Sequence, residues 1–241
     1  MRREELEEKR LKRSSRMKFS ILSLFPEYFV GPLDVSMIKR AQDRGIISFD
    51  LVNIRDFALD KHKTVDDRPY GGGPGMVLKP QPVVDAIRSV RRADSHVVYL
   101  SPQGRVLNAS ICKELAERSH LILLCGHYEG IDARAVSLEV DEEISIGDYV
   151  LTSGAPAALV LLDAVIRFLP GTIGHPEAVK QDSFEEGIFD NLHYTRPPEF
   201  EGLSVPEVLM SGHHGEIEKW KKKQALEKTG KVRPDLIRQS L

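Results

Sequence analysis

The chain has 241 residues, a length that suits one or two globular domains with enough chain to bury a core. Its 41% hydrophobic and 29% charged residues exclude a disordered protein, and no apolar run approaches a membrane-spanning length. The net charge of −2 argues against a strongly basic nucleic-acid binder, and the only cysteines, Cys112 and Cys125, indicate reduced thiols rather than a disulfide framework.

Residues 1–16 are basic but also rich in glutamate, and they contain no apolar segment. Neither a secretory signal nor an acid-poor transit peptide has this composition. We therefore expect a disordered extension at residues 1–16 and a cytoplasmic location for the protein.

From residue 17 onward, apolar strands alternate with amphipathic helices. We predict strands at residues 19–25, 46–54, 96–100 and 121–125, and helices at residues 34–43, 81–92, 108–119 and 157–168. Gly45 follows the first helix as a C-terminal glycine does, and Asn108 can cap the third. The alternation predicts an α/β fold with a parallel sheet covered on both faces, in which ligands bind at the carboxyl ends of the strands.

A glycine-dense loop at residues 66–76 superficially resembles a phosphate-binding loop. It lacks the Gly-Lys-Ser/Thr ending of a nucleotide P-loop, and no G-x-G-x-x-G sequence follows a strand. The sequence therefore favours neither a P-loop nucleotide site nor an ordinary dinucleotide-binding fold.

The strongest ligand signal lies in residues 121–154. An apolar strand breaks into Gly126-His127-Tyr128-Glu129-Gly130, and a second glycine-containing turn covers residues 145–154. Glycine has no Cβ and accepts positive φ, so backbone at these positions can approach a bound molecule closely. Each turn alone is equally compatible with an ordinary connection of an α/β protein.

The C-terminal part differs in composition. Residues 174–191 are polar and aperiodic, which indicates a linker, and a charged helix follows at residues 216–227 with Trp220 as its anchor and Gly230 just past its end. Residues 213–241 carry eight basic and four acidic side chains, a net charge of +4. Such a cluster is either a solvated helix face or a patch that contacts phosphates.

Covalent and metal chemistry have no clear residues here. The histidines lack metal-ligand spacing, and no serine lies in a G-x-S-x-G elbow. Arg167 follows an apolar helix and either snorkels to solvent or points into a site. Asp182, in the polar linker, is either a helix N-cap or a catalytic base.

Several segments, in order along the chain, are similar to one known family: SLFPEYF (23–29), TVDDRPYGGGPGM (64–76), YLSPQGR (99–105), CGHYEGID (125–132), DEEISIGDYVL (141–151), DSF (182–184), HYTRP (193–197) and VLMSGHHGEI (208–217). They closely resemble bacterial tRNA (guanine-N1)-methyltransferases, from residue 17 to the end of the chain. The resemblance implies a SPOUT-class enzyme that methylates the guanine just 3′ of the tRNA anticodon, at position 37, with S-adenosylmethionine and Mg²⁺. It also implies a homodimer with its active sites at the subunit interface.

In structural terms, the resemblance implies a trefoil-knotted parallel sheet flanked by helices, an exception to the rule against threaded loops. The knotted cofactor-binding domain would cover residues 17–173. A flexible linker at 174–190 would join it to a small helical tRNA-binding domain at 191–241.

The resemblance also implies roles for individual residues. Arg167 and Asp182 would be catalytic. The cofactor would be surrounded by Tyr99, Leu100, Ser101, Pro102, Gly126, Tyr128, Glu129, Ser145, Ile146, Gly147, Tyr149, Leu151 and Gly154. Two positions depart from the family pattern, since Ser153 stands where a glycine is expected and Ala155 where a carboxylate is expected.

Two rival functions remain at this stage. A ribose 2′-O-methyltransferase of the same knotted class would activate a hydroxyl group and would not need the aspartate in the linker. A catalytically silent RNA-binding protein could keep the fold but would bind no S-adenosylmethionine. Analysis of the methylated nucleoside separates the first rival, and calorimetric titration with the cofactor separates the second.

Overall fold

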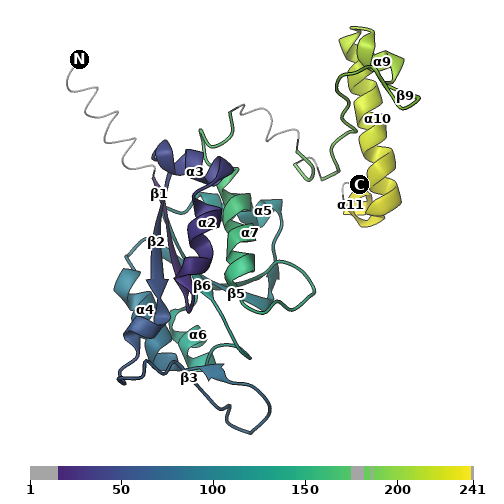
Figure 1. Ribbon diagram of the computed structural model, residues 1–241. Coiled ribbons are helices and arrows are strands. Elements are labelled where there is room, and N and C mark those ends of the chain that lie inside the picture. Colours follow the sequence, from purple (N-terminus) through teal and green to yellow (C-terminus); the bar gives the residue numbers. More distant parts are fainter. Residues whose placement is uncertain (1–15, 175–181, 186, 240–241) are drawn as a thin grey trace, which may run out of the picture. The chain divides into compact units, whose positions relative to one another are not determined.

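A computed structural model of the chain describes residues 16–174, 182–185 and 187–239 (Figure 1). The chain divides into two compact units, Met1–Gly174 and His175–Leu241. The predicted extension, apart from its last residue, and residues 175–181 and 186 of the predicted linker lie outside the described part.

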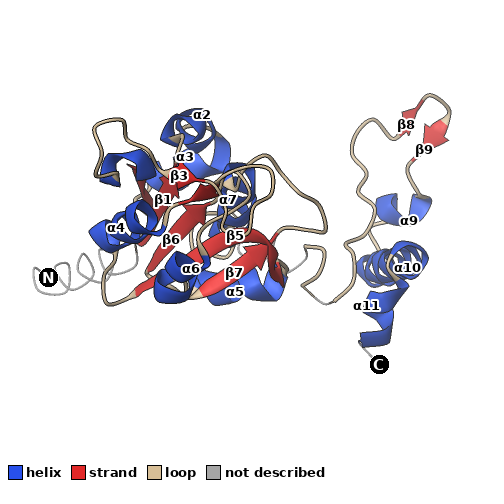
Figure 2. Ribbon diagram, turned by 90° about the horizontal axis from the view of Figure 1, so that it is seen from below, coloured by secondary structure: helices blue, strands red, loops and turns tan. Residues whose placement is uncertain are grey.

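The first unit is built on five parallel strands in the order β2-β1-β6-β5-β7 (Figure 2). They are β1 (Met17–Ser23), β2 (Ile47–Asn53), β5 (Ser95–Val106), β6 (His120–Cys125) and β7 (Glu142–Ser145). A short antiparallel pair, β3 (Asp66–Asp67) and β4 (Val77–Leu78), lies outside this sheet. The predicted α/β fold with a parallel sheet is confirmed.

Helices cover both faces of the sheet. They are η1 (Pro26–Phe29), α2 (Val30–Leu33), α3 (Ser36–Asp43), η2 (Ile54–Phe57), α4 (Pro80–Val90), α5 (Ala109–Ala116), α6 (Ala133–Glu139) and α7 (Ala155–Ile166). One core cluster joins the sheet to α3, α5 and α7, and the other joins it to α4 and α6 (Figure 1). All six residues of β6 are buried, as expected for a central strand packed on both faces.

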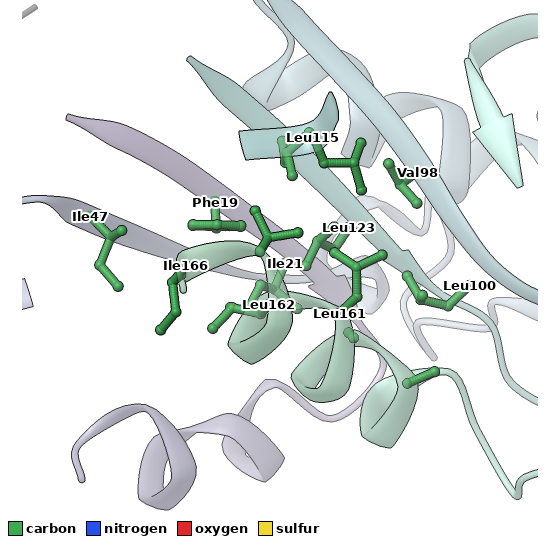
Figure 3. Close-up of a cluster of buried hydrophobic side chains, with 14 of the residues drawn as sticks. Phe19, Ile21, Ile47, Val98, Leu100, Leu115, Leu123, Leu161, Leu162 and Ile166 are labelled. Atoms are coloured by element: carbon green, nitrogen blue, oxygen red, sulfur yellow. The ribbon is translucent and has the colours of Figure 1, made fainter. Parts of the chain in front are cut away.

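Alternation along the strands sends neighbouring side chains to opposite clusters. In β6, Leu121 and Leu123 pack in the cluster of α7, whereas Ile122 and Leu124 pack in the cluster of α4. Figure 3 shows Leu161 and Leu162 of α7 facing the strand side chains of the first cluster. This two-sided core fixes the position of the strand ends, where the candidate site lies.

The predicted helices of this unit are confirmed, with ends that differ by at most three residues. Gly45, with φ of +70°, follows α3 as expected, and the Asn108 side chain accepts a hydrogen bond from Ile111 N at 3.0 Å at the start of α5. The sequence reading missed α6 and β7. It also ended the third predicted strand at Leu100, whereas β5 continues to Val106.

The end of β5 is irregular where it meets β7. Leu100 and Arg105 both align with Ile144, so the four residues between them bulge out of the ladder. Within the bulge, Gly104 has no room for a side chain because the backbone of Glu143 and Ile144 lies against it. The bulge therefore carries residues 101–104 to the carboxyl edge of the sheet.

The second unit consists of a small hairpin and helices: β8 (Glu199–Phe200), β9 (Leu203–Ser204), α9 (Glu207–Met210), α10 (His214–Val232) and α11 (Pro234–Gln239). The prediction that Gly230 lies past the end of the charged helix is wrong, because α10 continues to Val232. A Cβ at Gly230 would lie 3.3 Å from the Ile237 side chain, so a small residue lets α11 pack closely against α10. Tertiary packing overrides the usual preference of glycine for a helix end.

Part of the predicted linker lies against α10. Phe189 N donates to Thr229 Oγ1 at 2.9 Å, and Asp190 N donates to Ser183 Oγ at 2.9 Å. Trp220 is half-buried on α10, with its ring centroid 6.1 Å from that of Tyr194.

Across the described ranges, none of the helices has both the length and the apolar character that a membrane span requires.

Candidate active site

Two loops from distant parts of the sequence meet at the carboxyl end of β6. Gly154 N donates to Gly126 O at 2.8 Å, and an isolated antiparallel bridge pairs His127 with Ser153. The chain that leaves β7 thus returns to the loop that follows β6. The bulge of β5 lies at the same carboxyl edge of the sheet. Ligands of parallel sheets bind at this edge.

Glycine is required at two positions of this junction. A Cβ on Gly154 would lie 2.9 Å from Gly126 N and 3.0 Å from Cys125 Cα, in backbone that cannot move aside easily. Gly147 has φ of +146°, and a Cβ there would lie 2.5 Å from Tyr149 Cε1. The loops can therefore come together only with glycine at these positions.

The two loops and the bulge of β5 line a cavity of about 270 Å³. Every one of the predicted cofactor-binding residues lines it: Tyr99, Leu100, Ser101, Pro102, Gly126, Tyr128, Glu129, Ser145, Ile146, Gly147, Tyr149, Leu151 and Gly154. The lining residues that the prediction left out are His127, Gly130, Ile144, Val150, Thr152, Ser153 and Ala157. Most of these residues lie inside the two glycine-containing loops. A prediction that included every residue of both loops would therefore have contained them.

Hydrogen bonds within the second loop hold its shape. Ser145 Oγ donates to Gly147 O at 3.0 Å and accepts from Gly147 N at 3.2 Å, while Tyr149 OH donates to Ile146 O at 3.2 Å. The backbone of this wall is thus held in place by its own side chains. A preformed wall lowers the cost of ordering a ligand.

The cavity has little charge. Glu129 is the one residue with a formal charge among the described lining residues. Burial, and then the charge of Glu143, raise the pKa of the Tyr99 phenol, so Tyr99 stays neutral and lines the wall as an aromatic ring. Burial also raises the pKa of the Cys125 thiol just below the cavity, which makes this cysteine an unreactive core residue.

The glycine-dense loop supports this cavity from outside. Glu129 N donates to Met76 O at 3.0 Å, and Leu78 N donates to Gly130 O at 3.0 Å. Gly75 has no space for a Cβ because the Glu129 side chain lies against it. The loop at residues 66–76 therefore positions Glu129, a role that its sequence did not reveal.

The two departures from the expected pattern have local explanations. Ser153 Oγ accepts from Ala155 N at 3.4 Å, next to the start of α7, and Ser153 also forms the bridge with His127. Ala155 is 4% exposed and belongs to the core cluster of α7. A small apolar residue fits this buried position without a polar group to satisfy.

Comparison with known proteins decides the family. The family described as tRNA (Guanine-1)-methyltransferase TrmD matches residues 17–239. The chain belongs to this family.

Three relatives named "tRNA (guanine-N(1)-)-methyltransferase" show how close the similarity is. The relative from Protochlamydia amoebophila (strain UWE25) is 62% identical over 92% of this chain and 100% of its own length. The relative from Chlamydia pneumoniae is 57% identical over 91% of this chain and 61% of its own length. The relative from Dictyoglomus turgidum (strain DSM 6724 / Z-1310) is 50% identical over 92% of this chain and 90% of its own length.

The two predicted catalytic residues of this tRNA (guanine-1)-methyltransferase family member lie in different units. Arg167 is exposed and is the C-cap residue that directly follows α7 in the first unit. Asp182 is half-buried in the second unit, where it lines a cavity of about 510 Å³ together with Lys219, Lys221 and Lys222 of α10. The residues described after Asp182 form a turn, with Glu185 N donating to Asp182 O at 3.2 Å, rather than a helix that Asp182 would cap.

The described ranges contain no cluster of metal-ligating side chains. None of these residues forms a group of three or more His, Cys, Asp or Glu side chains that could hold a metal ion. The predicted Mg²⁺ therefore has no assigned ligands in this family member.

Proposed function

We propose that this chain transfers the methyl group of S-adenosylmethionine to N1 of the guanine just 3′ of the anticodon, position 37 of tRNA. The observation that carries the proposal is the cavity at the carboxyl ends of β5, β6 and β7, which gathers all of the cofactor-binding residues implied by the family resemblance. The name that the relatives share, tRNA (guanine-N(1)-)-methyltransferase, supports both the substrate and the methylated atom.

The cavity fits S-adenosylmethionine by its chemistry. Leu100, Ile144 and Leu151 offer apolar surface for an adenine ring, and the loop backbones offer polar groups to its edge. S-adenosylmethionine carries a sulfonium and an ammonium group against one carboxylate, so its net positive charge suits a cavity whose formal charge comes from Glu129. When bound, it supplies an electrophilic methyl group.

The chain's own residues must deal with a proton. Guanine N1 is protonated, so its lone pair becomes available only when a base removes that proton. Asp182 is proposed as the base and Arg167 as the group that neutralises negative charge on guanine O6 as the proton leaves. A carboxylate is a weak base for so weak an acid as guanine N1, so removal of this proton needs such electrostatic help at O6.

Magnesium remains part of the family expectation. A divalent cation near O6 would stabilise the same negative charge as Arg167. Because no described cluster fits the ion, we assign it neither ligands nor a step.

We further propose a homodimer whose active sites lie at the subunit interface and act on tRNA in the cytoplasm. The first unit exposes large apolar side chains on consecutive elements: Tyr28 and Val30 in η1 and α2, then Val35, are each about half exposed, as is Val160 of α7. Of these elements, η1 and α7 are in contact with each other. Apolar surface of this kind marks a site of protein association.

A mixed dimer tests the shared site. One subunit carries Gly147→Trp, which fills the cavity, and the other carries Asp182→Asn. If each site combines one subunit's cavity with its partner's Asp182, one site inherits both defects and the other neither, so about half of wild-type activity returns. If each site is built within one chain, mixing restores nothing. Differential tags verify that subunits have exchanged.

The central experiment is a methyl-transfer assay with tRNA that has guanine at position 37 and at its neighbours. We expect 1-methylguanosine at position 37 alone, and no product when adenine replaces that guanine. Recovery of a 2′-O-methylated nucleoside would reject the proposal in favour of the ribose methyltransferase. Failure to bind S-adenosylmethionine in calorimetry would favour the silent RNA-binding protein.

A further inference from the structure

The second unit has a groove separate from the cavity of Asp182. Its volume is about 640 Å³, and its walls come from residues 191–196, from Pro198 and Val205, and from α9 and α10. Leu192, Tyr194 and Met210 line it and are 44%, 47% and 56% exposed, respectively. These exposed apolar side chains lie together in one groove, and the proposed catalytic steps make no use of it.

Tyr194 gives the groove an aromatic wall that is supported from behind. Its ring lies 6.1 Å from that of Trp220 at an interplanar angle of 60°. Trp220 does not line the groove, so it holds the ring while about half of Tyr194 stays open to solvent. A supported, exposed aromatic ring is the usual platform on which an unstacked nucleobase is held.

The groove also has cationic and polar lining residues. Arg196 and Lys221 supply positive charge, and Asn191 and Thr195 supply hydrogen-bonding groups. Lys221 forms an ion pair with Glu218 at 3.1 Å, but on a helix surface such a pair is worth little and can exchange for a phosphate. Apolar side chains, hydrogen-bonding groups and positive charge in one groove together match the base, the sugar and the phosphate of a nucleotide.

The groove adjoins the cavity of Asp182. Asn191 and Lys221 line both hollows, so the two open side by side along α10. A nucleotide in one hollow and its neighbour in the other would be joined by a phosphate near Lys221.

From this arrangement we infer that the Tyr194 groove holds an unstacked nucleobase of the anticodon loop, next to the target guanine at Asp182, with Lys221 contacting the phosphate between them. The inference rests on the proposed function, because it takes tRNA as the substrate. It adds a positioning site that places the target guanine by holding its neighbour.

The test is a binding cycle between the full chain and an anticodon stem-loop RNA. Each nucleotide next to the target guanine is replaced in turn by an abasic one, and the dissociation constant is measured with wild type and with Tyr194→Leu. Leucine keeps apolar contact with Trp220 but removes the stacking face. The fluorescence of Trp220, the single tryptophan of the chain, reports both binding and the integrity of the unit.

We expect one abasic position to weaken wild-type binding roughly 5- to 150-fold, the usual effect of one stacked base. Tyr194→Leu should weaken binding of the intact RNA to a similar extent, and combining both changes should cost no more than either alone. Tyr194→Phe, which keeps the ring, should bind like wild type. So should Phe200→Ala, an exposed aromatic residue of the same unit that lies outside the groove.

Two results would overturn the inference. Tyr194→Leu could bind every RNA like wild type, or it could weaken all of them equally with no abasic position coupled to it. Should Tyr194→Leu bind normally but change the oligomeric state in sedimentation, the groove is covered by a second copy instead. Wild-type methyl transfer to intact tRNA is measured in parallel, so a wrong proposed function appears as absent product, whereas a wrong groove appears as product without coupling.

Discussion

The two units of this protein bury their side chains very differently. In the first unit, a parallel sheet is packed on both faces by two clusters of buried apolar residues. In the second unit, Ala225 and Thr229 are the only buried residues among those described. Aromatic and aliphatic side chains such as Tyr194, Phe200 and Met210 stay exposed there instead.

This contrast separates two ways of making a binding site. The first unit offers a preformed cavity whose walls are fixed by the sheet and by glycines that admit no side chain. The second unit offers exposed apolar groups and lysines on a long helix, which become buried only when a partner covers them. We therefore expect changes at the cavity of the first unit to affect cofactor binding and stability, and changes in the second unit to affect RNA binding and chemistry.

Asp182→Asn should produce the largest effect, because it tests whether the second unit supplies chemistry as well as surface. Asparagine keeps the shape of the side chain but cannot take the proton from guanine N1. Turnover should fall roughly 10²- to 10⁴-fold while the affinity for S-adenosylmethionine is kept. Single-turnover kinetics and calorimetry measure the two quantities, and near-normal turnover would remove Asp182 from the mechanism.

Arg167→Ala tests whether the first unit supplies a catalytic group outside its cavity. Loss of the charge proposed to act at O6 should lower turnover about 10²- to 10³-fold, as removal of one oxyanion donor does. Arg167→Lys is the conservative control, since it retains the positive charge. A change confined to the Michaelis constant would assign Arg167 to substrate binding.

Gly154→Ala tests the rigidity of the cavity. The added Cβ would lie within 3.0 Å of backbone atoms of Cys125 and Gly126, so the junction of the two loops must shift. We expect a loss of about 1–3 kcal/mol in stability together with weaker cofactor binding, measured by thermal unfolding and calorimetry. Gly31→Ala is the matched control, because a Cβ there meets nothing within 4 Å.

Replacing Lys221, Lys222 and Lys223 with Gln tests the cationic face of the second unit. For every phosphate that one of these lysines neutralises, the substitution should flatten the salt dependence of tRNA binding by about 0.7 to 0.9. Cofactor affinity should not change, because these lysines and the cofactor cavity lie in different units. A salt slope equal to that of wild type would show that this helix face is only solvated.

The smallest expected effect concerns His120, at the start of β6. Its ring is buried, with Nε2 2.9 Å from Ser20 Oγ and Nδ1 2.7 Å from Ser95 Oγ. Burial first, and then the charges of Lys18 and Arg92, lower its pKa below the ordinary value of about 6.5.

The lowered pKa predicts the sign of a pH effect on stability. Well above pH 6.5 the ring is neutral in both states, and as the pH falls through 6.5 toward the folded pKa the unfolded state binds the proton first, so stability decreases. His120→Gln should flatten this part of the stability curve in denaturant titrations between pH 7 and 5. A curve for His120→Gln parallel to that of wild type would assign the decrease to another group.

Sequence patterns predicted the strands and helices whose signals are local. The continuous apolar run of β6, the cap at Asn108 and the glycine after α3 each encode their structure within a few residues. β7 was missed because its charged residues, Glu142 and Glu143, tolerate an edge position and show no apolar run. Whether the chain is knotted as the family resemblance implies stays a prediction.

The sequence by itself determined the fold class and the family motifs, and the resemblance carried by those motifs named most of the residues that line the cavity. Only the tertiary structure decided that they form one site, because the strand order β1-β6-β5-β7 brings residues 101–104, 126–130 and 145–154 to the same edge. The tertiary structure also decided that the glycine-dense loop holds Glu129. It likewise decided that Gly230 lies inside α10, next to Ile237. The physical reason is common to all three, since a contact between distant segments depends on where the packed sheet and helices bring them, and no local pattern records that.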